Sequence, residues 1–199
     1  MTNDFWNERY SANEYIFGTE PNEYFRSMID TLKPGKILIP AAGEGRDAVY
    51  AARLGWEVIA FDLSSVGKKK AMELAELNKV NIEYQICDLK DFDFGIEEYD
   101  VIAPIYFHLP SEIRKMFYNK IKQSLKINGC LILEAFNRRQ LENNSGGPKD
   151  LDMLLTKEIL ENELLGLRII ENNESEITLK EGGGHVGKAN VVRVYAVRK

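Results

Sequence analysis

The feature that most constrains the fold is the run from Ile37 to Ser64, ILIPAAGEGRDAVYAARLGWEVIAFDLS. It begins with a short apolar segment, typical of a strand buried on both faces of a parallel sheet. A turn of small residues follows, then a helical pattern that ends at Gly55, and then a second apolar strand that ends at Asp62. Two parallel strands joined through a helix need a crossover connection, so this run predicts a parallel sheet.

Strand and helix patterns keep alternating along most of the remaining chain. Further helices are predicted within 20–32 and over 65–79 and 111–129, and further strands over 81–87, 99–107 and 130–136. The C-terminal part differs, because a short helical pattern at 156–166 is followed by two consecutive strand patterns, 168–181 and 189–199, joined by EGGGHVGK. We therefore predict a doubly wound α/β fold with a mostly parallel seven-stranded sheet. A C-terminal antiparallel hairpin closes it and puts one antiparallel strand at its edge.

Length and charge limit the number of domains and the kind of partner. With 199 residues we expect one domain over 1–199, with an N-terminal lid and helix at 1–33 and a catalytic core at 34–199. The formal net charge of −5 argues against a nucleic-acid partner, because phosphate binding depends on clustered Lys and Arg. We expect a small-molecule partner, no metal site, and a monomer or homodimer.

The N-terminus and the cysteines indicate the compartment. MTNDFWNERY lacks the basic and apolar regions of a signal peptide, and no apolar run is long enough to span a membrane. Cys87 and Cys130 each lie within an apolar strand pattern, where a reduced thiol serves as a small hydrophobic group. These features predict a cytoplasmic protein without a membrane partner.

The turn after the first strand is the predicted ligand site, because open α/β sheets bind ligands beyond the carboxyl ends of their strands. Gly43 and Gly45 allow close approach of the backbone and a positive φ, and the next helix directs free N–H groups into the crevice. Asp62, nineteen positions after Gly43, can accept hydrogen bonds from two ribose hydroxyls. This logic serves a dinucleotide and S-adenosylmethionine alike, and Gly43–Ala48 also satisfies the dinucleotide pattern G-x-G-x-x-A.

Several features favour an adenosyl sulfonium over a dinucleotide. Glu44 would face the pyrophosphate of a dinucleotide, whereas it is compatible with a sulfonium. Asp88, after the third predicted strand, is placed to accept a hydrogen bond from an adenine amino group. In addition, no chain remains for the substrate domain that a dehydrogenase normally needs.

These residues together resemble the class I S-adenosylmethionine-dependent methyltransferases over nearly the whole chain. The resemblance rests on the Ile37–Ser64 run, the Asp88-Leu89 pair, the Tyr99-Asp100 strand start, SLKINGCLILEAF and the terminal hairpin. It implies a Rossmann-like methyltransferase fold. Trp6–Tyr10 and Gly18–Pro21 resemble the small bacterial tellurite-resistance-type methyltransferases, and IPAAGEGRD is similar to the thiopurine and thiol methyltransferase branch.

One departure from the family concerns the end of the first strand. The usual motif has an acid there and a glycine two positions later, and this chain has Ile39 and Ala41. The thiopurine-like branch also lacks the acid.

The resemblance implies S-adenosylmethionine as cofactor and assigns a set of residues to it. The backbone of the turn would face the methionine portion, an acid and a leucine would hold the ribose, a second such pair would hold the adenine, and an isoleucine would line the inner side. Arg9 would pair with the cofactor carboxylate. The proposed set is Arg9, Ala41, Gly43, Gly45, Asp62, Leu63, Asp88, Leu89 and Ile105.

Aromatic residues and two histidines are candidates for the acceptor side. Six residues are assigned to the lid and the acceptor pocket: Trp6, Tyr10, Tyr15, Phe17, Phe107 and Arg138. The four N-terminal aromatics are spaced too irregularly for one helix face, so they form either a lid or the packing of the first helix. His108 and His185 are the candidates for handling a proton, and they alternatively cap a helix and occupy an exposed hairpin tip. Lys68–Lys70 reads as a solvated helix face.

The sequence thus predicts methyl transfer from S-adenosylmethionine to a small molecule, such as a thiol or a chalcogen oxyanion. Two alternatives stay open at this point. One is a nicotinamide-dependent reductase that uses the same turn, and the other is a non-catalytic protein that binds S-adenosylmethionine.

Overall fold

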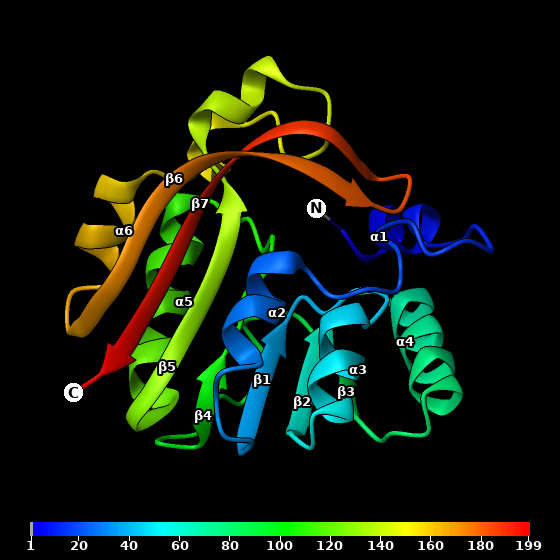
Figure 1. Ribbon diagram of the computed structural model, residues 1–199, viewed down its shortest axis with the longest axis horizontal. Coiled ribbons are helices and arrows are strands. Elements are labelled where there is room, and N and C mark those ends of the chain that lie inside the picture. Colours follow the sequence, from blue (N-terminus) through cyan, green and yellow to red (C-terminus); the bar gives the residue numbers. More distant parts are fainter. Residues whose placement is uncertain (1) are drawn as a thin grey trace.

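A single seven-stranded sheet organises the computed structural model, which describes residues 2–199 (Figure 1). The strands are β1 (Lys36–Pro40), β2 (Glu57–Asp62), β3 (Glu83–Ile86), β4 (Tyr99–Ile102), β5 (Leu125–Phe136), β6 (Leu167–Glu181) and β7 (His185–Arg198). Their order across the sheet is β3-β2-β1-β4-β5-β7-β6. The pairs among β1 to β5 are parallel, and β7 is antiparallel to both of its neighbours. The predicted doubly wound α/β fold with a closing hairpin is confirmed.

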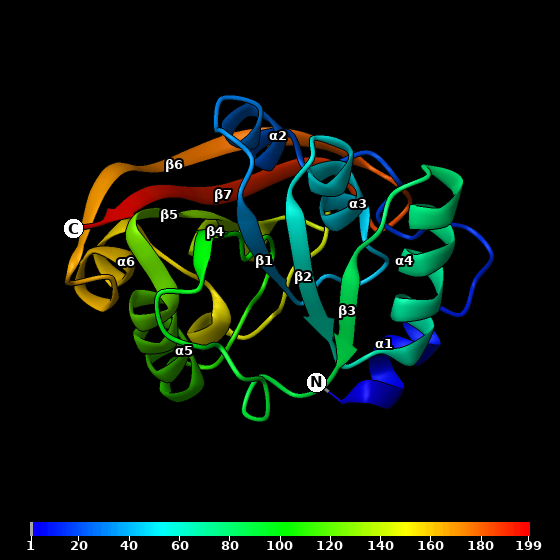
Figure 2. The same ribbon diagram turned by 90° about the horizontal axis from the view of Figure 1, so that it is seen from below.

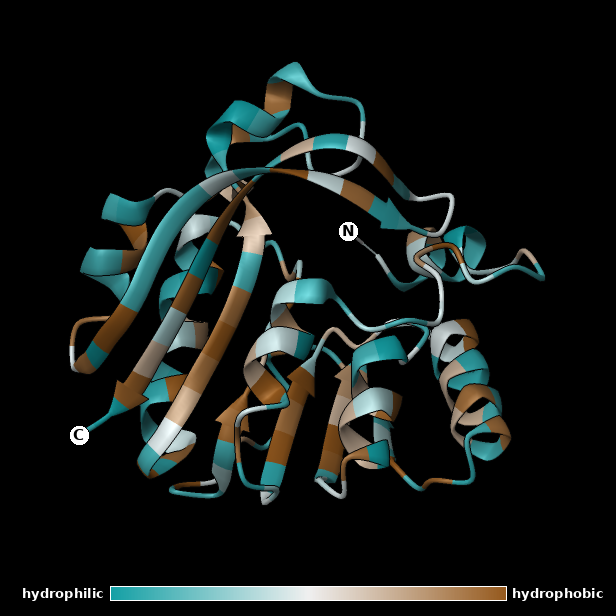
Figure 3. Ribbon diagram, viewed as in Figure 1, coloured by the Kyte–Doolittle hydropathy of each residue, from teal (hydrophilic) through white to brown (hydrophobic). Residues whose placement is uncertain are grey.

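The antiparallel strand lies inside the sheet, so the prediction that it forms the edge was wrong. β7 inserts between β5 and β6, and β6 becomes the edge strand. The composition of the two strands explains this order, because Val191, Val192 and Val194 of β7 are fully buried, whereas β6 contains the polar run ENNESE. Polar and charged side chains suit an edge strand, which must avoid pairing with other chains. In Figure 3, β6 is largely hydrophilic and β1 is hydrophobic.

Helices cover both faces of the sheet and create two apolar cores. They are α1 (Asn3–Arg9), α2 (Glu23–Ile29), α3 (Arg46–Arg53), α4 (Ser65–Leu77), α5 (Ser111–Ser124) and α6 (Lys157–Glu163). Figure 2 shows α2 and α3 on one side of the sheet and α5 and α6 on the other. The loop at 88–98 contributes Phe92 and Phe94 to the core on the α5 side of the sheet. There Phe92 stacks on Phe61 with ring centroids 4.3 Å apart.

Two helix boundaries differ from the prediction. The helix predicted over 111–129 ends at Ser124, and β5 already begins at Leu125, which is fully buried and pairs with Tyr99. Pairing with β4 therefore overrides the local helical pattern of 125–129. The sequence analysis also missed α1, where Trp6 and Tyr10 are one helical turn apart and stack. Among residues 2–199, no helix has the length and apolarity needed to cross a bilayer.

Candidate cofactor and acceptor site

The turn after β1 adopts the left-handed backbone conformation at several positions. Ala41, Gly43 and Gly45 have φ values of 50°, 53° and 86°. A Cβ atom on Gly45 would lie 2.5 Å from the Cβ of Ala71, so this glycine permits the close packing of α3 on α4. A Cβ atom on Gly43 would instead lie 2.7 Å from the hydroxyl oxygen of Tyr10, on the crevice side. Gly43 therefore permits the close approach of the Tyr10 ring to the turn.

Asp62 holds this turn against the end of β2. Its carboxylate accepts hydrogen bonds from the N–H groups of Gly43 (3.0 Å) and Ser64 (2.8 Å). Burial raises the pKa of Asp62, and these backbone hydrogen bonds oppose the shift. A carboxylate has about four acceptor positions, so Asp62 can still accept hydrogen bonds from ribose hydroxyls.

A cleft of about 430 Å³ opens beside Asp62, at the carboxyl ends of β2 and β3. It is lined by Leu63, Ile86, Cys87 and Asp88, and by Thr2 and Asn3 from the N-terminus. The predicted ribose residue Leu63 and the predicted adenine residue Asp88 thus share one cleft. The apolar side chains of Leu63 and Ile86 and the carboxylate of Asp88 fit the adenosine portion of the cofactor.

Leu89 and Ile105 do not line this cleft. Leu89 is buried in the core under α5, and Ile105 is buried in the core under α2 and α3. Both were predicted to contact the cofactor, and here their side chains support the strands that carry the site.

Helix α1 lies over the carboxyl ends of β2 and β3 and is anchored to α4. Asn7 accepts hydrogen bonds from the Ser64 hydroxyl (2.7 Å) and from the N–H of Val66 (3.3 Å). Tyr10 is buried against Gly43. Burial, followed by the charges of Asp62 and Glu44, raises the pKa of the Tyr10 phenol well above its ordinary value. The side chain of Tyr10 therefore stays neutral at the methionine end of the predicted cofactor site.

Residues 11–18, which we call the strap, are fixed to the turn by a buried ion pair. Lys70 Nζ donates to Glu44 Oε1 (2.6 Å) and to the carbonyl oxygens of Ala12 (2.8 Å) and Glu14 (2.7 Å). Glu44 Oε2 accepts the N–H of Ile16 at 2.8 Å. The prediction that Lys70 belongs to a solvated helix face was wrong. Of the three lysines at 68–70, Lys70 is the one that is buried and pairs with the buried carboxylate of Glu44.

This ion pair also changes the interpretation of Glu44. Its carboxylate binds Lys70 and the strap, and Glu44 is not among the residues that line the cleft. In the folded protein, Glu44 therefore does not repel a pyrophosphate at the turn, contrary to the prediction from the sequence. Tyr15 adds a further strap contact to α4, because its hydroxyl donates to the Lys70 carbonyl at 2.9 Å.

The tip of the β6–β7 hairpin reaches the strap from the opposite side (Figure 1). The N–H of Gly184 donates to the carbonyl of Ile16 at 2.7 Å. Arg46, the first residue of α3, donates to the carbonyl of Phe17 (3.0 Å) and to Glu181 (3.1 Å). The strap is thus held between the cofactor turn and the hairpin.

Four rings form a compact group on the acceptor side, which we call the aromatic box: Phe17, Tyr106, Phe136 and His185. The His185 ring centroid lies 4.4 Å from that of Phe17, 4.7 Å from that of Tyr106 and 5.4 Å from that of Phe136. Tyr106 has a positive φ of 53°, which is uncommon for a non-glycine residue and concentrates at functional sites. Its hydroxyl donates to the buried Glu134 at 2.8 Å.

The two histidines have different environments. His108 Nε2 accepts the N–H of Phe136 at 3.0 Å, and burial lowers the pKa of His108 to about 4. Because this nitrogen already accepts a backbone hydrogen bond, His108 is unsuited to accept a proton, contrary to its predicted role. His185 is also buried, which excludes the exposed hairpin tip as an alternative.

The other predicted acceptor residues are spread over the surface and the core. Phe107, predicted for the lid or the acceptor pocket, packs edge-to-face on Phe117 of α5 and is partly buried. Arg138 is exposed at the start of a short 3-10 helix, Arg138–Glu142. Arg9, predicted to pair with the cofactor carboxylate, is exposed, and its guanidinium lies 5.6 Å from the Phe17 ring centroid.

The sequence analysis missed Tyr106, Phe136, Glu134 and Glu181. Tyr106 and Phe136 follow or end strands at the ligand edge of the sheet, which is the signal that could have identified them. Glu181 precedes His185 by four positions across the hairpin turn. Glu134 gave no signal, because it lies in an apolar strand pattern and only the fold reveals its partners.

Comparisons with known proteins decide what this site serves. Residues 37–129 match the family described as "Methyltransferase domain". A thiopurine S-methyltransferase from Vibrio atlanticus (strain LGP32) is 22% identical over 162 residues, which cover 70% of this chain and 72% of that protein. The matched domain and this relative support a class I S-adenosylmethionine-dependent methyltransferase. These matches favour S-adenosylmethionine over the nicotinamide dinucleotide that a reductase would use.

Solved structures share the fold of this methyltransferase. TehB from Haemophilus influenzae superposes with a TM-score of 0.73 at 18% identity, covering 99% of this chain and 67% of that chain. Magnesium protoporphyrin IX methyltransferase (ChlM) from Synechocystis PCC 6803, solved with bound SAH, superposes with a TM-score of 0.67 at 16% identity, covering 99% and 97% of the two chains.

Proposed function

We propose that this methyltransferase acts on a small molecule that carries a soft nucleophile, such as a thiol or a chalcogen oxyanion. The aromatic box beside the cofactor turn is the observation that carries the proposal. Its rings come from four separate segments, and the strap and hairpin close over them. The names of the thiopurine relative and of TehB agree with such an acceptor. We expect no nucleic-acid or membrane partner, and a single cytoplasmic domain that works as a monomer or homodimer.

Different residues of the site would bind different parts of the cofactor. When bound, S-adenosylmethionine supplies an activated methyl group on a sulfonium. Asp62, Leu63 and Asp88 would bind its adenosine portion in the cleft, and Gly43 would approach its methionine portion. The rings of Trp6, Tyr10 and Phe17 would stabilise the sulfonium, by about 1 to 2 kcal/mol for a desolvated cation on a ring face. The protein's main contribution is then to orient the acceptor and to exclude water.

Product detection with a panel of acceptors tests this proposal. The wild type is incubated with S-adenosylmethionine and alkyl thiols, aromatic thiols, selenite or tellurite, and methylated products are identified by mass spectrometry. We expect turnover with at least one of these soft nucleophiles and none with amines or catechols of similar size. Turnover confined to nitrogen or oxygen acceptors would overturn the substrate class while leaving the methyltransferase assignment in place.

A further inference from the structure

We propose that Glu181 and His185 form a proton-accepting pair, in which Glu181 orients the imidazole and His185 takes the proton of a neutral thiol acceptor. This inference rests on the proposed function. It makes His185 the catalytic base and gives a positioning role to Glu181, which the sequence analysis did not single out.

The hairpin turn fixes the geometry of the pair. Glu181 is the last residue of β6, His185 is the first of β7, and the two face each other in the strand register. His185 Nδ1 lies 2.9 Å from Glu181 Oε2. An ionised carboxylate only accepts hydrogen bonds, so Nδ1 must carry the proton, and Nε2 of the neutral ring is left as the acceptor.

Gly146 packs against the Nε2 side of the His185 ring. A Cβ atom on Gly146 would lie 3.0 Å from His185 Nε2 and 2.6 Å from Cδ2, so only a glycine at this position leaves room for the imidazole. The rings of Phe17, Tyr106 and Phe136 surround the rest of the imidazole. His108 provides the contrast, because its Nε2 is occupied by the N–H of Phe136. Of the two histidines, His185 alone presents an Nε2 without a hydrogen bond within the described residues.

Hydrogen-bond donors, nearby arginines and burial hold Glu181 ionised and His185 neutral. Arg46 donates to Glu181 Oε2 at 3.1 Å and Asn22 donates to Oε1 at 3.2 Å. Burial raises the pKa of Glu181, but its partners His185 and Arg46 outweigh this and lower it. Burial, with Arg46 and Arg9, lowers the pKa of His185, and Glu181 opposes that shift. The imidazole is therefore neutral near pH 7, as a base must be.

The proton transfer balances with methyl transfer. His185 Nε2 accepts the proton of the acceptor's S–H group while the acceptor sulfur forms its new bond to the methyl carbon. Both electrons of the broken carbon–sulfonium bond stay on the departing sulfur, which becomes neutral. Glu181 stabilises the imidazolium until it releases the proton to solvent. Because Arg46 begins α3 directly after Gly45, the same contacts couple this pair to the cofactor turn.

Histidine titration by NMR tests the pair without catalysis. The chain has two histidines, so His108→Gln assigns their signals. In the wild type we expect His185 to carry its neutral proton on Nδ1. Glu181→Gln should lower the pKa of His185 by about one unit, since removal of a 2.9 Å negative partner removes about 1.4 kcal/mol of preference for the imidazolium.

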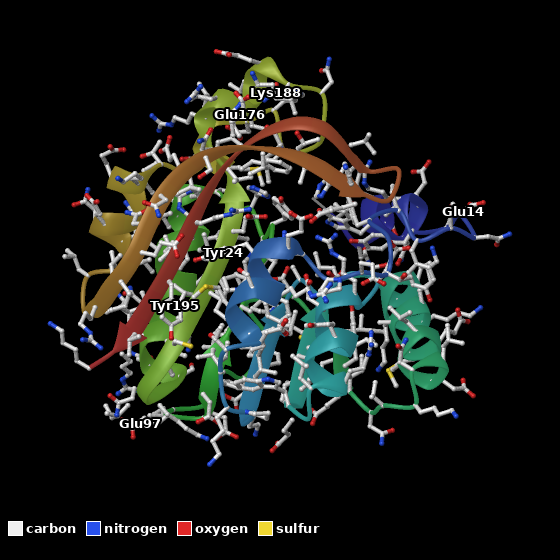
Figure 4. All side chains as sticks on the ribbon, in the orientation of Figure 1. Glu14, Tyr24, Glu97, Glu176, Lys188 and Tyr195 are labelled. Atoms are coloured by element: carbon white, nitrogen blue, oxygen red, sulfur yellow. The ribbon has the colours of Figure 1, made fainter. Side chains whose placement is uncertain are left out.

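The control for this titration is Glu176→Gln. Glu176 lies on the same strand, β6, but it is exposed and pairs with Lys188 of β7 at 2.7 Å. Both residues are labelled near the top of Figure 4. This control should leave both histidine pKa values unchanged. An unshifted His185 in Glu181→Gln, or a neutral proton on Nε2, would overturn the proposal.

Two thiols of different acidity test the catalytic role. His185→Gln should lower turnover of an alkyl thiol about 100-fold, the lower end of the usual effect of a general base, and change that of an aromatic thiol already ionised at the assay pH only a few-fold. Glu181→Gln should affect the alkyl thiol alone, and Glu181→Asp, which keeps the carboxylate, should restore most of its turnover. Equal losses for both thiols would overturn the inference.

Calorimetry with S-adenosylhomocysteine separates this failure from failure of the proposed function. All variants should bind it like the wild type, because neither residue lines the adenosine cleft. If the wild type binds it but methylates neither thiol, this inference falls, and the soft-nucleophile proposal falls with it if selenite and tellurite are not methylated either. If turnover and binding are intact and only the difference between the thiols is absent, this inference alone falls.

Discussion

Ala41 shows how a single residue can carry strain at a ligand site. Its φ of 50° is the left-handed conformation that costs about 1 to 2 kcal/mol for a residue with a Cβ atom. This is the position where the family usually has glycine. The strain persists because Asp62 and the end of β1 fix the turn around it.

We predict that Ala41→Gly raises the free energy of unfolding by about 0.5 to 1 kcal/mol. Relief of the left-handed strain should exceed the added entropy of glycine in the unfolded chain, which costs about 0.4 to 1 kcal/mol. Urea unfolding checks the sign. Ala42→Gly is the matched control, and since Ala42 lacks a positive φ it should destabilise the protein. If Ala41→Gly also destabilised the protein, the left-handed conformation of Ala41 would not carry the predicted energetic cost.

Asp62 is the residue on which cofactor affinity should depend most. We predict that Asp62→Ala weakens S-adenosylhomocysteine binding at least tenfold, because each hydrogen bond to a charged group contributes about 1.5 to 3 kcal/mol. Calorimetry measures the loss. Asp91→Ala, on the exposed loop after β3, should leave the affinity unchanged. An unchanged affinity in Asp62→Ala would remove this residue from the site.

At the scale of elements, the strap depends on one buried cation. We predict that Lys70→Met frees the strap, because it breaks three hydrogen bonds and leaves Glu44 buried without its partner, a change that costs about 3 to 5 kcal/mol for a buried pair. Amide exchange at Ile16 should accelerate strongly. Lys69→Met, on the same helix but exposed and 3.9 Å from Glu73, should leave that exchange as it is.

The sequence predicted the elements well where one local pattern sufficed. The β1–α3–β2 unit, Asp62 and Asp88 followed from apolar runs that end in a turn or an acid. It failed where distant parts decide, as in the pairing of Leu125 with Tyr99, the insertion of β7 beside β5, and the burial of Lys70 by Glu44. Phe107 and Tyr106 illustrate the same limit, because neighbours in sequence point to opposite faces and only packing shows which one reaches the site.

At the scale of the whole molecule, His108 links stability to pH. Its pKa is about 4 in the folded protein and about 6.5 in the unfolded chain, so below pH 6.5 only the unfolded state takes up the proton. We predict that its contribution is fully present above pH 6.5 and falls by about 3 kcal/mol as the pH drops to 4.

Chemical unfolding at several pH values measures this loss. The difference between the wild type and His108→Gln isolates it, because both proteins share every other titrating group. A difference that stays constant between pH 7 and pH 4 would show that His108 is protonated in the folded state.

The hairpin has a consequence for how the enzyme is made. Gly43, Asp62 and Asp88 emerge from the ribosome early, whereas Glu181, His185 and the strand that fills the gap between β5 and β6 come last. The acceptor side is therefore complete only after β7 has inserted between β5 and β6. A chain that ended before residue 185 would lose the catalytic imidazole together with the fully buried valines of β7, so the acceptor side and part of the core would be missing at once.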